Sequence, residues 1–210
     1  MLKIEDFMNM LIGGADRIIA AKDELTDIDS RFGDADHGIT MEKLMESVKR
    51  SIMTSGSSAS FKQMLESASK GVMMINGGSA VPLWSTLFDG MSQAAPDKSE
   101  IDESELKQLF NSGCQTLFAL STANVGDKTM MDALIPAVSA ISAAEGDAKA
   151  IMEAGAKAAT DGAEATKNFI SKFGRAKSYR EQTLGTPDAG ATSMKYFFVG
   201  MSEALLRQLI

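Results

Sequence analysis

The sequence predicts an all-α fold of about eight helices that run antiparallel to their neighbours. Apolar residues recur at three- and four-residue spacing through most of the chain, and no segment shows the alternation of a half-buried strand. The links between these periodic segments are mostly short, which makes consecutive helices antiparallel neighbours. The 210 residues can bury a sizeable core, so we expect residues 1–210 to form a single domain.

The first half of the chain contains four predicted helices. Residues 3–22 carry one apolar face, residues 39–54 a second and residues 61–75 a third. Serine and glycine runs end the second and third helices. A fourth helix covers residues 79–96, with Pro82 in its first turn, where a missing N–H does no harm. These residues therefore form two antiparallel pairs.

The second half contains four more predicted helices. One of them is long and rich in alanine, and a glycine-rich basic loop at 174–190 separates it from the last. A stretch at 121–128 is irregular. The helices cover residues 102–120, 129–144, 147–172 and 191–209.

Alternate links of an up-and-down bundle lie at the same end, and here one set of links carries all of the unusual residues. The other set, at residues 55–58, 96–101 and 145–147, consists of ordinary polar turns. We therefore expect a functional site at one rim of the bundle. Its links are residues 29–38, 76–79, 121–128 and 174–190.

The first of these links places Asp29, Asp34 and Asp36 next to His37, the only histidine of the chain. Carboxylates this close repel one another by a few kcal/mol unless a cation lies between them. Oxygen ligands without thiolates favour magnesium or calcium over zinc or copper. No frame supplies both the sixth-position glycine and the twelfth-position glutamate of an EF-hand loop, so a magnesium–phosphate site is favoured over that motif and over a solvated acidic turn.

Phosphate binding is predicted by the other links of this rim. Two glycine-containing stretches, 77–79 and 188–193, lead into helices, whose first N–H groups attract anions. Ordinary helix caps are the alternative explanation. Arg175 and Lys177 could contact a polyphosphate directly or form a solvated basic loop. Together with a carboxylate-held cation, these features predict a site for a nucleoside diphosphate or triphosphate.

The segment Gly126-Asp127-Lys128-Thr129 is not a Walker A loop, because an aspartate separates glycine from lysine. Asp127 could cap the helix that follows it. His37 could contact a phosphate, ligate a metal or hydrogen-bond within its loop.

The composition argues against some classes of partner. A formal net charge of −7 disfavours nucleic acid and anionic membrane, both of which bind basic patches. No stretch approaches the roughly 20 apolar residues of a membrane span. The acidic N-terminus is unlike a signal peptide, so we expect a cytoplasmic protein. Cys114 is expected to be a buried small apolar residue.

Three segments together resemble a known family. They are Asp29 with Gly33-Asp34-Ala35-Asp36-His37-Gly38, the segment 126–130 and the segment 188–193. Over essentially its full length the chain is similar to the nucleotide-binding subunits of phosphoenolpyruvate-dependent dihydroxyacetone kinases. The resemblance implies an eight-helix antiparallel up-and-down barrel with the nucleotide, ADP or ATP, at one rim.

The same resemblance implies roles for particular residues. Asp29, Asp34 and Asp36 would hold two magnesium ions, and with Arg175 they would support phosphoryl transfer by positioning and charge neutralisation. The nucleotide would be lined by His37, Gly38, Ile39, Thr40, Gly78, Ser79, Ala80, Ser121, Met130, Arg175, Asp188, Ala189 and Gly190.

Two partner subunits are also implied. In that family a separate kinase subunit holds dihydroxyacetone, and a phosphohistidine subunit of the sugar phosphotransferase system recharges the bound ADP. A chain of this length without a ketone-binding domain fits the split arrangement better than the fused ATP-dependent one. A homodimer is left open.

Some residues depart from the family pattern. Ser79 is displaced by one position, Val81 replaces a glycine, Thr40 stands where asparagine is frequent and Ser121 where glycine is usual. Nucleotide choice or exchange could therefore differ. Three alternatives remain: a regulatory nucleotide sensor that docks on a transcription factor, a relative acting on another short ketose, and a magnesium-dependent phosphohydrolase with His37 as base.

Overall fold

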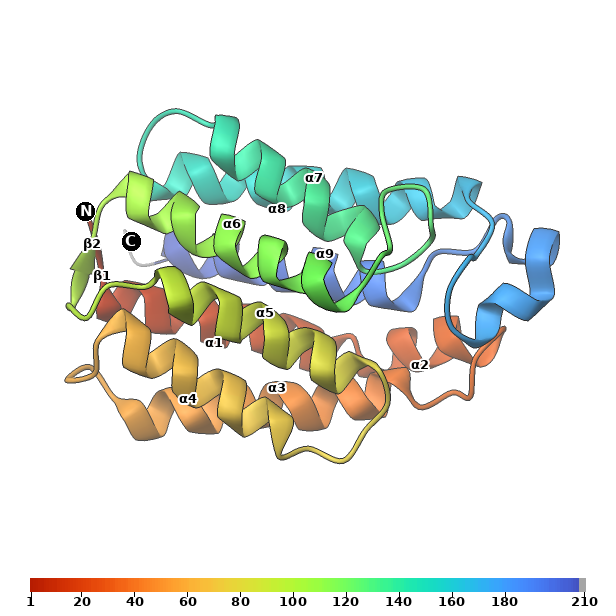
Figure 1. Ribbon diagram of the computed structural model, residues 1–210, viewed down its shortest axis with the longest axis horizontal. Coiled ribbons are helices and arrows are strands. Elements are labelled where there is room, and N and C mark those ends of the chain that lie inside the picture. Colours follow the sequence, from red (N-terminus) through yellow and green to blue (C-terminus); the bar gives the residue numbers. More distant parts are fainter. Residues whose placement is uncertain (208–210) are drawn as a thin grey trace.

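A computed structural model describes residues 1–207, in which eight long helices form a closed antiparallel ring (Figure 1). The ring closes because the last helix packs against both the first helix and the helix that precedes it in the chain. The predicted all-α barrel is therefore confirmed. In order around the ring the helices are α1 (Ile4–Ala20), α3 (His37–Ser55), α4 (Phe61–Met73), α5 (Ala80–Ala94), α6 (Glu103–Leu120), α7 (Met131–Ala143), α8 (Ala148–Ala165) and α9 (Ala189–Arg207).

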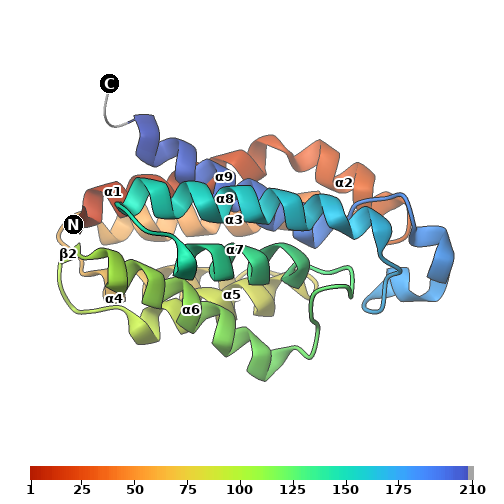
Figure 2. The same cartoon turned by 90° about the horizontal axis from the view of Figure 1, so that it is seen from above.

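A further helix, α2 (Lys22–Ser30), was not predicted. It follows α1 almost without a break and packs on α3 and α9, outside the ring (Figure 2). Its apolar face is small, since Leu25 is its one fully buried residue. That weak pattern is why periodicity did not reveal it.

The sequence placed the end of one helix wrongly by several residues, and other helix ends differ from the prediction by one or two residues. The helix predicted at 147–172 ends at Ala165, and a short 3-10 helix, η1 (Thr166–Asn168), follows it. The loop predicted at 174–190 contains a second 3-10 segment, η2 (Arg175–Thr183), with a kink at Arg180. The last helix begins at Ala189 rather than 191, and its predicted end at 209 lies outside the described residues.

Two very short strands also contradict the expectation of a strand-free chain. Leu2–Lys3 (β1) pairs antiparallel with Glu100–Ile101 (β2) at the end of the barrel that carries the N-terminus. Two residues per strand are too few for an alternating pattern to be recognised.

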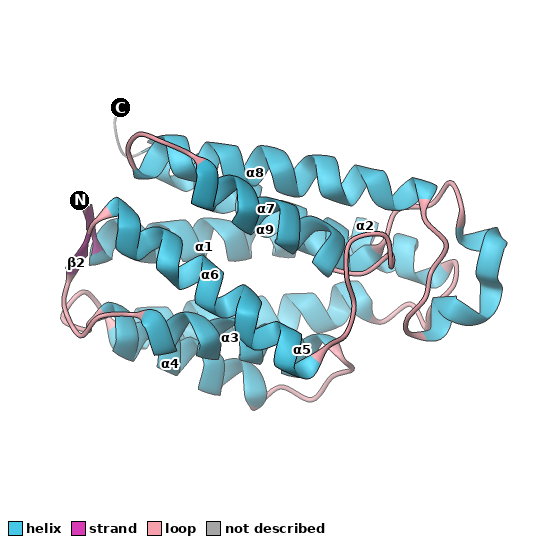
Figure 3. Cartoon of the chain, turned by 45° about the horizontal axis from the view of Figure 1, so that its top comes forward, coloured by secondary structure: helices cyan, strands magenta, loops and turns pink. Residues whose placement is uncertain are grey.

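The expected division of the links between two ends is confirmed. The links that follow α4, α6 and α8 gather with α2 at one end, while both termini and the strands lie at the other (Figure 3). The rim that carries the aspartate loop is therefore made of segments that are distant in sequence. None of the helices within residues 1–207 combines the length and the apolar character needed to cross a membrane.

Aromatic side chains fill the centre of the barrel. The ring of Trp84 on α5 meets the ring of Phe197 on α9 edge to face, with centroids 5.1 Å apart. Phe88 of α5 also meets Phe197 edge to face, and Phe110 of α6 packs on Phe198. Since α5 and α9 lie on opposite sides of the ring, the interior is a packed core rather than a channel.

Helices α1 and α9 approach each other through glycines. A Cβ atom added to Gly13 would lie 2.7 Å from the carbonyl oxygen of Gly200, and one added to Gly200 would collide with the carbonyl oxygen of Gly13. The two backbones are therefore in contact where the ring closes.

Replacing Gly200 with alanine should destabilise the protein by about 1–3 kcal/mol, because the new methyl group overlaps the backbone of α1. Urea unfolding in EDTA measures the effect. Gly78→Ala is the matched control, since an added Cβ there meets nothing within 4 Å. Equal stabilities of Gly200→Ala and the wild type would contradict the close approach.

Candidate metal centre and nucleotide site

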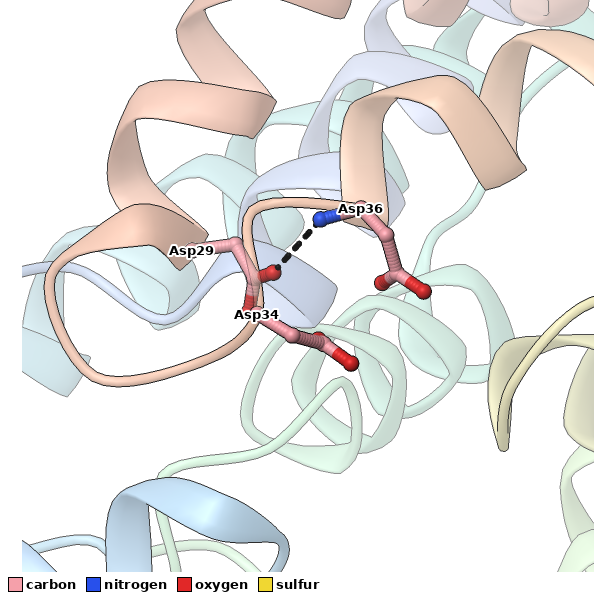
Figure 4. A group of neighbouring side chains, drawn as sticks. All are labelled: Asp29, Asp34 and Asp36. Atoms are coloured by element: carbon pink, nitrogen blue, oxygen red, sulfur yellow. Dashed lines mark hydrogen bonds between the residues drawn. The ribbon is translucent and has the colours of Figure 1, made fainter.

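The loop between α2 and α3 brings three carboxylates together. Asp29 lies in the last turn of α2, Asp34 in the loop, and Asp36 immediately before α3 (Figure 4). One carboxylate oxygen from each of the three lies within 4.8 Å of the others. The Asp36 N–H donates to Oδ2 of Asp29 at 3.2 Å, which folds the loop back onto α2. The sequence prediction of this cluster is confirmed as a geometric grouping.

The backbone of this loop depends on small residues. A Cβ on Gly33 would collide with Oδ1 of Asp29, and one on Gly38 would collide with the carbonyl oxygen of Lys22. Ala35 has a φ of +59°, a left-handed conformation that costs an alanine about 1–2 kcal/mol. Strain of this kind persists where the surrounding structure imposes it, as at binding sites.

The electrostatics of the cluster suit a divalent cation. Burial raises the pKa of Asp36, and the nearby charges of Asp34 and Asp29 raise it further, while Arg175 lowers it. The guanidinium of Arg175 pairs with Oδ2 of Asp34 at 2.7 Å. A cation placed among the carboxylates would remove their repulsion, and three convergent carboxylates form the oxygen-only ligand set that Mg²⁺ prefers. Asp29, Asp34 and Asp36 could therefore hold magnesium.

His37 connects the start of α3 to the start of α9. Its Nε2 lies 2.8 Å from Oγ of Ser193, and because the Ser193 hydroxyl donates to the carbonyl of Ala189, the imidazole donates to Ser193. Burial lowers the pKa of His37 and favours its neutral form. The hydrogen bond expected for His37 was one within its own loop, but the bond that the structure shows reaches Ser193 on α9 instead. The acidic cluster found in residues 1–207 does not include His37.

Asp188 caps the first turn of α9. Its Oδ2 accepts the N–H of Ala191 at 2.7 Å, and its own N–H donates to Oγ1 of Thr166. The pKa of Asp188 is raised to about 7, chiefly by burial; the charge of Asp132 contributes to the rise, while the hydrogen bond from Ala191 and the charge of Lys128 oppose it. The start of α9 is thus fixed in place by a buried carboxyl group whose pKa is raised.

The other predicted nucleotide-lining residues fall into small groups at the same rim. A Cβ on Gly190 would lie 3.3 Å from the amide nitrogen of Met130, so the starts of α9 and α7 adjoin. A Cβ on Gly77 would lie 2.8 Å from a methyl carbon of Thr40, so the link before α5 lies against α3. Ala189 is buried, while Ile39 and Gly78 are exposed.

Ser79 and Ser121 occupy helix ends. Ser79 is exposed at the N-cap position of α5, followed by Ala80, and its hydroxyl accepts no capping hydrogen bond. Ser121 ends α6, where its hydroxyl accepts the N–H of Ala123 at 3.2 Å. The hydroxyl of Ser121 is thus engaged in the turn that follows α6.

Asp127 does not cap α7, which corrects that expectation. Its carboxylate accepts the N–H of Asn124 at 2.8 Å and pairs with Lys172 at 2.6 Å. The carboxylate that receives the N–H groups before α7 is Asp132, which accepts from Gly126 and Thr129, both at 2.6 Å. The Thr129–Asp132 spacing, typical of a capping box, was the sequence signal that could have identified it.

The sequence also missed residues whose role depends on distant partners. Ser193 lies within the motif at 188–193 but was not assigned a contact with His37. Lys128 was compared only with a Walker A lysine, yet it points inward and is 4% exposed. Thr166 and Thr183, which are fully buried in the link between α8 and α9, carry no local signal at all.

Residues 31–203 match the DAK2 domain family. The chain belongs to the DAK2 domain family. It is 32% identical to the D-erythrulose kinase of Mycolicibacterium smegmatis over 184 residues, which are 86% of this chain and 32% of that protein. It therefore spans about a third of the length of that relative.

Other DAK2 relatives match along nearly their whole length. The chain is 27% identical to the ADP-binding subunit DhaL of the PEP-dependent dihydroxyacetone kinase of Escherichia coli, covering 90% of this chain and 91% of that subunit. It is 30% identical to a corresponding ADP-binding subunit of Listeria innocua, covering 90% of each.

The fold of this DAK2 domain is shared with a solved structure, the dihydroxyacetone kinase of C. freundii. The TM-score is 0.73 at 22% identity, over 93% of this chain and 34% of that one. The same kinase in complex with AMP-PNP and Mg²⁺ gives a TM-score of 0.73 at 20% identity, over 93% and 33% of the two chains.

Asp36→Asn should separate the repulsion within the acidic cluster from the binding of Mg²⁺ by that cluster. In EDTA the variant should be at least as stable as the wild type, because repulsion from Asp29 and Asp34 is relieved. Added Mg²⁺ at a hundredfold excess over its dissociation constant should stabilise the wild type by about 2.7 kcal/mol and the variant far less. Thermal unfolding with and without Mg²⁺ is the measurement.

The control for this variant is Asp97→Asn, an exposed aspartate in the link before β2, at the opposite end. It should behave as the wild type in both conditions. An Asp36→Asn protein that gains as much stability from Mg²⁺ as the wild type would exclude Asp36 as a ligand.

The stability of the ligand-free protein should depend on the protonation of Asp188. Its folded pKa of about 7 lies above the ordinary value, so the folded state holds the proton more tightly and stability falls as the pH rises from about 4 to about 7. Asp188→Asn, which keeps an oxygen acceptor for Ala191, should reduce that fall. Urea unfolding of the wild type and the variant at several pH values measures this dependence. If the free energy of unfolding of the variant changed with pH as much as that of the wild type, Asp188 would not be its cause.

Proposed function

We propose that this chain is the nucleotide-binding subunit of a multi-subunit kinase for a short ketose, with ADP or ATP and two Mg²⁺ ions at the rim that carries the aspartates. The observation that carries the proposal is the grouping of Asp29, Asp34 and Asp36 within 4.8 Å, with Arg175 bonded to Asp34. An acidic cluster beside an arginine and several helix N-termini is an arrangement suited to a metal-bound polyphosphate.

The residues of the chain would bind and orient rather than react covalently. The three aspartates would hold the metal ions, and the planar guanidinium of Arg175 would contact phosphate oxygens. When bound, magnesium neutralises the charge on the phosphate oxygens during transfer. The nucleotide would lie against the residues at the starts of α3, α5, α7 and α9 and at the end of α6, which include His37 to Thr40, Gly78 to Ala80, Ser121, Met130 and Asp188 to Gly190.

Two partner subunits complete the proposed reaction. The near-complete overlap with the E. coli ADP-binding subunit supports a split arrangement. The bound nucleotide would accept a phosphoryl group from a phosphohistidine subunit of the phosphotransferase system and pass it to dihydroxyacetone on a second subunit. Relatives include a D-erythrulose kinase and an L-erythrulose kinase, so a four-carbon ketose is the alternative substrate.

The rim offers a surface for the ketose-holding subunit. Exposed apolar side chains gather at this end of the barrel, on the last turn of α6 and on the links after α6 and α8. Such grouping marks interaction surfaces in soluble proteins. The surface comprises Phe118, Leu120, Val125, Ile170, Phe173, Tyr179 and Leu184.

Native mass spectrometry of the purified chain, before and after EDTA, tests nucleotide binding directly. We expect ADP with two magnesium ions, lost together on chelation, because the metal ions bridge the aspartates and the phosphates. A chain that is purified empty and binds Mg-ADP only weakly would contradict a permanently held coenzyme.

Arg175→Ala should reduce phosphoryl transfer to the ketose by about a hundredfold, since a preorganised cation at the phosphates is removed. The assay combines the chain with its two partner subunits and compares dihydroxyacetone with D- and L-erythrulose. Lys167→Ala is the control, because this lysine is an exposed cation of the same link that pairs only with Glu164. Transfer at the wild-type rate by Arg175→Ala would exclude the proposed role.

A further inference from the structure

The ammonium group of Lys128 is buried in a cage of backbone carbonyls. Its Nζ lies 2.8 Å from the carbonyl oxygen of Thr166, 2.7 Å from that of Thr183 and 2.6 Å from that of Thr186. The carbonyl oxygen of Phe169 lies at 3.2 Å. All four carbonyls belong to residues 166–188, the segment that joins α8 to α9 and carries Arg175. We call it the crossover segment.

The turn that presents Lys128 is built to point it inward. Lys128 has a φ of +61° and follows Gly126 at +95°, and the carboxylate of Asp132 holds the turn by accepting the N–H groups of Gly126 and Thr129. Non-glycine residues in this conformation are uncommon and concentrate at functional positions. The lysine therefore cannot act as a phosphate-binding lysine at the rim.

The cage is polar but not an ion pair. In the described residues the acceptors of the Lys128 ammonium are neutral carbonyls. Burial lowers the pKa of Lys128, and the charges of Asp188 and Asp132 oppose that lowering without reversing it. Backbone carbonyl oxygens are also the groups that coordinate the monovalent cation K⁺ in channel filters. The crossover segment thus forms a small cation site, which Lys128 fills.

The outer tip of the crossover segment is held much more weakly than its base. Arg175 pairs with Asp34 through side chains that are 70% and 37% exposed, and the ring of Tyr179 contacts that of Phe32 at 5.1 Å. Exposed ion pairs contribute little to stability, because water screens their charges. At the base, the turn before α7 contributes the buried Lys128 and a second link, between Asp127 and Lys172.

We propose that Lys128 is a positioning residue: its ammonium fills the carbonyl cage of the crossover segment and so holds Arg175 at the aspartate loop. Removing the ammonium takes one donor from each of the four carbonyls. Those of Thr166 and Thr183 keep a local donor, the N–H of Phe169 and the hydroxyl of Thr186, but nothing then joins the four carbonyls to the turn before α7. The segment should therefore open locally while the barrel stays folded. That Lys128 anchors the crossover segment is independent of the proposed function. The expected effect of this anchoring on nucleotide binding rests on the proposed function.

Hydrogen–deuterium exchange of Lys128→Met tests the anchoring. We expect exchange in residues 166–188 to rise at least tenfold while the core of the other helices remains protected. Lys107→Met is the matched control, because the Nζ of Lys107 also bonds two carbonyls, those of Ser142 and Ala144, at the opposite end of the barrel. Exchange of the crossover segment at the wild-type rate in Lys128→Met would overturn the proposal.

A second variant covers the case in which Lys128→Met does not fold. Lys128→Ala leaves the cage open, and added NH₄⁺ should restore protection of the crossover segment. Tetramethylammonium at the same ionic strength is too large for the cage and should not. Equal effects of the two cations would overturn the cation-site assignment.

Mg-ADP affinity of single and double variants tests whether Lys128 acts through Arg175. Lys128→Met and Arg175→Ala should each weaken binding at least tenfold, and the double variant should bind no more weakly than Arg175→Ala alone. Additive losses would show that Lys128 affects the site by another route and would overturn the positioning role. If the wild type binds no Mg-ADP, the proposed function fails, and the exchange experiment still decides the anchoring.

Discussion

Mutual repulsion among three carboxylates is the constraint around which the rim is organised. Asp29, Asp34 and Asp36 lie close together only because the loop between α2 and α3 is fixed by its own backbone, through the hydrogen bond from Asp36 to Asp29 and the left-handed Ala35. Two of the carboxylates also have a partner of their own: that of Asp29 accepts the N–H of Asp36, and that of Asp34 pairs with Arg175. The packing of α2 on α3 and α9 and the hydrogen bond from His37 to Ser193 hold the loop between α2 and α3 in place against the remaining repulsion.

The barrel provides the rigidity that this arrangement needs. Its interior is filled by aromatic rings from opposite helices, and α1 and α9 close the ring through contacting backbones at Gly13 and Gly200. Close-packed interiors deform little, so the helix ends at the rim keep fixed positions relative to one another. Four helix starts that are far apart in sequence can then face a single ligand without a flexible domain.

The crossover segment is held by a different principle. It lies outside the barrel and buries few apolar side chains, so backbone carbonyls bonded to one buried ammonium replace a hydrophobic core at its base. A single turn before α7 thereby connects the rim of the barrel to the segment that carries Arg175. Membership of the DAK2 domain family accounts for the shared barrel, while the inward direction of Lys128 is a property of this turn.

The sequence alone determined the helices of the ring, the end at which the functional links gather and the aspartate cluster, because each depends on periodicity or on spacing within one loop. It could not find α2, whose apolar face is small, or place the end of α8, where the carbonyl of Thr166 turns to Lys128. The contacts of His37 and Lys128 were decided by tertiary structure alone. Their partners are backbone or hydroxyl groups that every sequence offers many times, and only the packed fold selects which ones meet.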